Sequence, residues 1–118
     1  MNLEKEKEKA FVQKRAKAAV ISRDFALAAR LYKSLLREDS GNIGLLSALG
    51  SLYVKAGDDK KALLYYEQIR TLSPNSFEAL NSMGGIYRRL QRYDESINVL
   101  QQALELGLND TQVNYNLG

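Results

Sequence analysis

Apolar residues recur at helical spacing along most of this chain, in segments separated by short polar turns. In residues 43–56, Leu46, Leu49 and Tyr53 follow one another at intervals of three or four positions, which is the spacing of one helix face. The other segments carry similar stripes, and none shows the strict alternation of a strand. We predict an all-α chain with helices at about 3–22, 24–38, 43–56, 60–72, 77–90, 93–106 and 111–118.

Turn residues between these segments support the predicted helix ends. Gly57 follows 43–56, where a glycine readily ends a helix. Asp58 and Asp59 come next and suit the start of the following helix, through capping and through the helix dipole. The turn at residues 73–76 contains the single proline, and Ser76 is predicted to cap the helix after it.

The same sequence pattern, called the phrase below, recurs with a period of 34 residues. It is Leu-x2-Leu-Gly-x2-Tyr and then Ala-x3-Tyr, first at Leu46–Tyr66 and again, with substitutions, at Leu80–Leu100. A fixed period of this length indicates units of two helices that bury their apolar faces against neighbouring units. In each unit, a glycine of the first helix (Gly50 or Gly84) is predicted to lie where the two helices cross closely. A small residue of the second helix (Ala62 or Ser96) is predicted to face it.

The phrase resembles the tetratricopeptide repeat (TPR) family, whose pattern is W-x2-L-G-x2-Y, A-x3-F and P. Residues 43–74 and 77–106 are similar throughout, 9–42 in the second half only, and 111–118 in the opening of a unit. The resemblance implies a single domain over 1–118, with units at about 9–42 (degenerate), 43–76 and 77–110 and a truncated unit at 111–118. Because the phrase is interrupted at Gly118, we expect a longer native protein.

The family resemblance implies a right-handed superhelix of stacked antiparallel helix pairs, a TPR-like α-solenoid, with the first helix of each pair on the concave wall. It also implies a scaffold or adaptor that binds a peptide or helix of a partner protein in that groove. The partner-binding residues are then expected on the inner side of the first helices, at Lys17, Ser47, Ser51, Lys55, Asn81, Arg88, Arg89 and Tyr115.

The distribution of charge along the chain indicates what kind of ligand the predicted inner wall binds. Residues 1–17 hold six basic and three acidic residues, which accounts for the whole net charge of +3. On the predicted inner wall, however, Lys55, Arg88 and Arg89 form a positive patch, and arginine suits contacts with carboxylates. We therefore expect an acidic ligand. The alternative is that these are solvated cations at helix C-terminal ends, where the helix dipole favours them.

Composition excludes several kinds of chemistry. The chain has no Cys and no His, which rules out disulfides, thiolate or imidazole zinc sites and His-based triads. Its conspicuous carboxylates fall at predicted helix starts, where capping explains them. We expect no enzymatic activity, no cofactor, no metal and no small-molecule substrate. There is no apolar run long enough for a membrane span and no secretory h-region, so a cytoplasmic protein without membrane insertion is expected.

The sequence also bears on functions other than the binding of an acidic peptide. Self-association through the C-terminal end, near Val113 and Leu117, or service as a targeting segment of a larger multi-domain protein remains open. RNA binding is disfavoured because the charge is confined to the first helix. The carboxylate clamp of chaperone-binding TPR proteins is not supplied, since Glu78 and Ser82 stand where that clamp has Lys and Arg.

Overall fold

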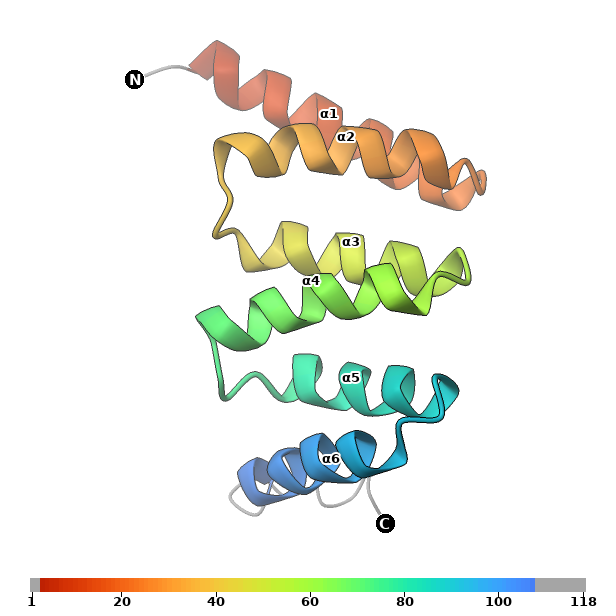
Figure 1. The fold of residues 1–118 in the computed structure, drawn as a ribbon. Helices are drawn as coiled ribbons and strands as arrows, with labels where there is room; N and C mark the ends of the chain where they lie inside the picture. The colour runs from red at the N-terminus through yellow and green to blue at the C-terminus, as the bar shows by residue number, and fades with distance from the viewer. Residues whose placement is uncertain (1–2, 108–118) are drawn as a thin grey trace.

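The structure is a computed structural model that describes residues 3–107. These residues form six helices and no strand (Figure 1). The predicted helix boundaries are confirmed to within two residues; the predicted helix 111–118 lies outside the described residues. The helices are α1 (Leu3–Ile21), α2 (Phe25–Glu38), α3 (Ile43–Lys55), α4 (Asp59–Leu72), α5 (Phe77–Arg89) and α6 (Tyr93–Gly107).

The helices form a stack of antiparallel pairs, α1–α2, α3–α4 and α5–α6, which follow one another from the N-terminal to the C-terminal end (Figure 1). Each helix packs chiefly on its neighbours in the chain, within its pair and toward the next pair. The core is therefore one continuous layer through the stack, with Leu46, Leu49, Leu80 and Met83 almost wholly buried. The stack of helix pairs is the arrangement that the 34-residue period predicts.

Local side-chain bonds fix the starts of four helices. Asp24, Asn42, Asp58 and Ser76 each precede a helix and accept a hydrogen bond from the main-chain N–H three residues on. These bonds satisfy N–H groups that have no partner within the helix. The predicted caps at Asp58 and Ser76 are confirmed, whereas Asp59 lies in the first turn of α4.

The turn inside each helix pair contains one residue with a left-handed backbone. These residues are Arg23 (φ 65°), Gly57 (φ 81°) and Gln91 (φ 61°), spaced 34 apart. Only Gly57 is predicted by a glycine signal in the sequence. The other two adopt the same conformation because the helices before and after the turn set it.

Small residues permit the closest helix approaches, as predicted, and larger side chains than expected also face them. A Cβ at Gly50 would lie 2.7 Å from the Tyr66 ring, and one at Gly84 would lie 2.6 Å from Cγ of Leu100. Ser96 faces Gly84 as predicted, and its buried hydroxyl donates a 2.8 Å hydrogen bond to the Gly84 carbonyl. Glycine is thus needed where a large side chain of the second helix crosses the first.

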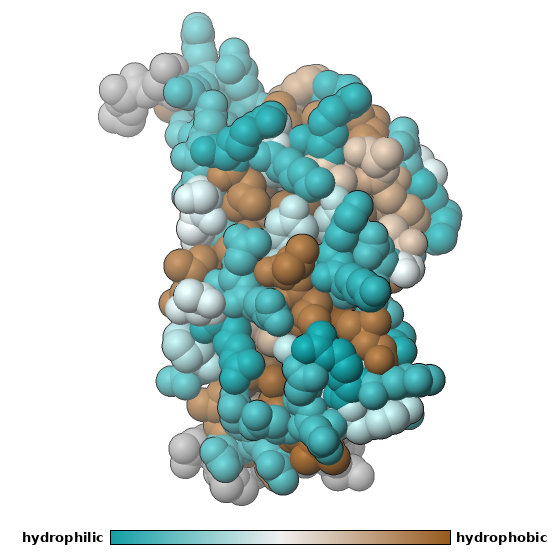
Figure 2. All heavy atoms as spheres, in the orientation of Figure 1, coloured by the Kyte–Doolittle hydropathy of each residue, from teal (hydrophilic) through white to brown (hydrophobic). Residues whose placement is uncertain are grey.

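Hydrophobic side chains also reach the surface. In Figure 2, hydrophobic residues show through a largely hydrophilic face near the middle of the stack. Leu64 of α4 and Ile97 of α6 are both more than half exposed. Across residues 3–107, no helix combines the length and the hydrophobicity that a membrane crossing requires.

Candidate binding groove

A groove runs between the C-terminal half of α1 and α3, the first helices of their pairs. It has a volume of about 250 Å³. Its apolar part comes from both helices and from Tyr32 of α2, and Lys17, Ser51 and Lys55 add polar groups. The full lining is Lys17, Val20, Ile21, Tyr32, Ala48, Ser51, Leu52 and Lys55.

The electrostatic character of the groove is positive. It contains two lysines and no carboxylate. Among the residues that the structure describes, neither Lys17 nor Lys55 takes part in an ion pair. Both side chains are exposed, and Ile21 beside them is 83% exposed although it is apolar. The groove therefore offers an apolar surface with cations at its edge.

Two other predicted residues are engaged within the protein. Ser47 donates a 2.7 Å hydrogen bond to Oε1 of Glu78, which joins α3 to α5. Arg89 makes a forked contact with Asp59, with Nε and Nη2 each donating to Oδ1 at 3.1 and 2.9 Å. This hydrogen bond raises the pKa of Arg89 above its usual range. The Arg89 contact thus links α5 to the start of α4.

The predicted positive patch is consequently divided. Lys55 lies in the groove with Lys17, while Arg89 is paired with Asp59. Arg88 and Asn81 are exposed on α5, outside the groove. Tyr115 lies outside the described residues. The structure therefore brings together Lys17, Ser51 and Lys55 of the predicted set.

Sequence reasoning missed the apolar half of this groove. Val20 and Ile21 belong to the first helix, from which the prediction took Lys17 alone. The signal was present, because Lys17, Val20 and Ile21 are spaced i, i+3 and i+4 and share one helix face. Tyr32 and Leu52 are buried and reach the groove from the core side.

Several carboxylates in the described part of the chain are held in structural contacts. Asp24 and Asp58 cap helices, and Glu95 pairs with Arg92, whose hydrogen bond lowers the pKa of that carboxyl. Residues 3–107 contain no cluster of acidic side chains suited to a metal ion.

A stack of helix pairs with a groove along its first helices defines a helical-repeat protein. The sequence model of the tetratricopeptide repeat matches residues 45–75 and 79–113, more than half of the chain. The chain therefore belongs to the tetratricopeptide repeat family, and the predicted family and TPR-like solenoid fold are confirmed.

Several curated proteins are similar in sequence. Human anaphase-promoting complex subunit 7 is 36% identical over 67 residues, which cover 57% of this chain and 11% of that protein. The ycf37 protein of Pyropia yezoensis is 30% identical over 90 residues, 75% of this chain and 51% of that protein. The chain thus spans about a tenth to a half of the length of these relatives.

Solved structures share the fold over most of the chain. A crystal structure of MamA superposes with a TM-score of 0.79 at 25% identity, covering 92% of this chain and 60% of MamA. The first TPR domain of Spaghetti (RPAP3), bound to the HSP90 peptide SRMEEVD, gives a TM-score of 0.76 at 17% identity. The second match covers 94% of this chain and 88% of that domain, and at this identity it establishes the fold alone.

Proposed function

We propose that this chain is a non-catalytic interaction module, a cytoplasmic scaffold or adaptor, that binds an acidic peptide segment of a partner protein. The observation that carries the proposal is the α1–α3 groove, where Lys17 and Lys55 stand beside an apolar surface that lacks any carboxylate. A segment with an apolar side chain and neighbouring acidic groups matches that arrangement.

Each groove residue has a definite part in this proposal. The ammonium groups of Lys17 and Lys55 attract carboxylates of the ligand, and the hydroxyl of Ser51 offers a hydrogen bond to its main chain. Val20, Ile21 and Leu52 take up the apolar side chain. Asn81 and Arg88 on α5 extend the surface for a longer ligand, and Tyr115, outside the described range, stays a predicted contact.

The comparison with Spaghetti supports peptide binding in general terms, because a domain of the same fold holds a short peptide that contains two glutamates. The partner of the present chain is expected to differ from that peptide. Glu78, at a position where the chaperone-type clamp has a cation, is an acceptor for Ser47. A carboxylate there repels a ligand carboxylate.

The test uses a charge reversal within the groove, Lys17→Glu/Lys55→Glu, and a matched reversal outside it, Lys14→Glu/Arg15→Glu. All four side chains are exposed, so both variants are expected to keep the wild-type circular dichroism. Proteins retained by immobilised wild type and by each variant are compared by quantitative mass spectrometry. We expect the groove variant alone to lose specific partners; retention of the same partners by both variants would overturn the proposal.

Arg89 is unsuitable for this test. Reversing its charge breaks the contact with Asp59 and leaves two acidic groups facing each other between α4 and α5. Loss of binding in such a variant would report altered packing as well as altered ligand contact. Arg88→Glu, on the exposed side of α5, is the appropriate variant for the extended surface.

A second candidate function is a targeting or self-associating segment of a larger protein. The observation that favours it is apolar exposure on α6, where Ile97 and Leu104 are 54% and 42% exposed. We expect Ile97→Glu to lower the average mass in light scattering if this face pairs with another copy. An equal monomer mass for wild type and variant would remove self-association through α6. RNA binding is the least favoured function.

A further inference from the structure

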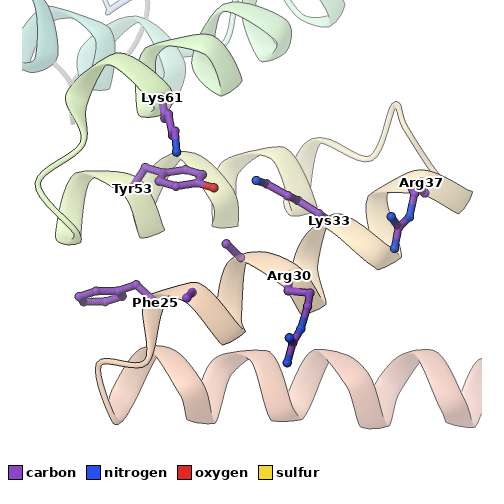
Figure 3. Close-up of a pocket in the computed structure, with 8 residues that line it drawn as sticks. Phe25, Arg30, Lys33, Arg37, Tyr53 and Lys61 are labelled. Atoms are coloured by element: carbon purple, nitrogen blue, oxygen red, sulfur yellow. The ribbon is translucent and has the colours of Figure 1, made fainter.

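A second hollow, with more positive charge, lies over α2 and the α3–α4 pair. Its volume is about 440 Å³, and we call it the basic hollow. Figure 3 shows Lys33 of α2 and Lys61 of α4 directed toward Tyr53 of α3, with Arg30 and Arg37 extending from α2. The full lining is Phe25, Ala26, Ala29, Arg30, Lys33, Arg37, Tyr53 and Lys61.

The α2 cations form one stripe. Arg30, Lys33 and Arg37 are three and four residues apart, so they share a helix face. Like charges at these spacings destabilise a helix, and in the described part of the chain none of the three is in an ion pair. The protein itself does not balance this charge.

The two lysine ammonium groups of the hollow lie over an aromatic ring. Lys33 Nζ and Lys61 Nζ each lie 5.5 Å from the centre of the Tyr53 ring. That ring is stacked on Tyr65 of α4, with centroids 5.7 Å apart and planes 7° from parallel. A hydrogen bond with Tyr53 also raises the pKa of Lys33. The two cations are therefore held in place before any ligand arrives.

We propose that the basic hollow docks an acidic segment of a partner protein, as a second binding surface independent of the α1–α3 groove. Charge complementarity carries this assignment, because four cations and no carboxylate line the hollow. Asp58 is 3.8 Å from Lys61, but both side chains are partly exposed at 41% and 60%, so this pair offsets little of the charge. Phe25, Ala26 and Ala29 add apolar lining to the hollow.

A nucleic acid fits the hollow less well than an acidic peptide. Single-stranded nucleic acids bind by stacking bases on free aromatic rings beside a basic track. Here Tyr53 is 8% exposed and covered by Tyr65 and the two lysines. The Phe25 ring carries the Arg23 guanidinium 5.1 Å from its centre. The Tyr53 ring is therefore not free to stack on a base, and the Phe25 ring is partly buried against the core.

The experiment measures fluorescence anisotropy with a labelled acidic peptide, GEELEELEEG, and with its neutral counterpart GQQLQQLQQG. Three double variants each remove two positive charges: Arg30→Gln/Arg37→Gln in the basic hollow, Lys17→Gln/Lys55→Gln in the groove and Lys14→Gln/Arg15→Gln elsewhere on α1. All six side chains are exposed, and a thermal melt checks that each variant is folded.

We expect the acidic peptide to bind and the neutral one to fail. Arg30→Gln/Arg37→Gln should weaken binding by about tenfold or more, as for the loss of charged hydrogen bonds, and the α1 control should weaken it far less. The proposal is overturned if the control matches the hollow variant, or if only the groove variant loses affinity. It is also overturned if single-stranded RNA binds the hollow more tightly than the peptide does. Loss confined to the groove variant supports the proposed function while removing this second surface.

Discussion

Gly50 of α3 lies against the ring of Tyr66 in α4, so closely that a Cβ at position 50 would be 2.7 Å from Cε2 of Tyr66. The ring is rigid and buried, so it cannot turn aside as the end of a flexible side chain does. The spacing of the two helices in this pair is thus set by the absence of a side chain at Gly50.

The first prediction concerns this crossing. Gly50→Ala should lower the free energy of unfolding by about 1–3 kcal/mol because the added methyl group overpacks the interface. Gly85→Ala is the control, since the nearest atom to a Cβ there is Arg89 Nη1 at 3.6 Å. That change should stabilise by up to about 1 kcal/mol through helix propensity. Urea unfolding measures both, and a stable Gly50→Ala protein would contradict the packing argument.

The second prediction concerns the left-handed turn residues. Gln91 has φ 61° at the position that Gly57 occupies in the preceding pair. Gln91→Gly should raise the free energy of unfolding by up to about 1 kcal/mol, because glycine adopts this conformation without steric strain. Gly57→Ala should lower it by a similar amount. Equal stability of the Gln91 variant and wild type would show that the turn stores no strain.

The third prediction concerns the forked contact between Arg89 and Asp59. A double-mutant cycle with Arg89→Gln and Asp59→Asn should give a coupling energy of about 0.5–1 kcal/mol, because the geometry is good but the pair is partly exposed. The matched cycle with Lys61→Gln and Asp58→Asn, at 3.8 Å, should give a coupling near zero. If both cycles give zero, the contact does not fasten α5 to α4.

The fourth prediction concerns alkaline pH. Burial raises the pKa of Tyr66, so the folded state holds this proton more tightly than the unfolded state. The stabilisation is complete below the ordinary tyrosine pKa of about 10 and is lost as pH rises through the folded value. We expect Tyr66→Phe to flatten the fall in unfolding free energy above that pH in urea titrations. Identical slopes for both proteins would refute the coupling.

Much of the fold was predictable because its determinants are local. Helix boundaries follow from apolar spacing and from caps such as Asp58 and Ser76, which act within three residues. The positions of Gly50 and Gly84 mark the crossings. The sequence did not reveal that Tyr66 and Leu100 also meet these glycines, because the repeat spacing pointed only to Ala62 and Ser96.

The candidate sites were predicted less completely. Lys17, Ser51 and Lys55 were placed on one wall by their position in the repeat, and they share a groove. The interpretation of Arg88 and Arg89 as one patch did not account for Asp59, which lies 30 residues from Arg89 in the chain. The basic hollow was missed because a count of charges along the chain balances to zero after residue 17.

The sequence by itself determined the helices, their order and the family to which the chain belongs, because period, capping and small-residue spacing act over one or two turns. Only the tertiary structure decided which charges are paired and which are free to bind. Asp59 neutralises Arg89, whereas Lys33 and Lys61 converge on Tyr53 from two helices. The physical reason is that contacts between helices depend on their rotation and distance, which are fixed when the side chains pack.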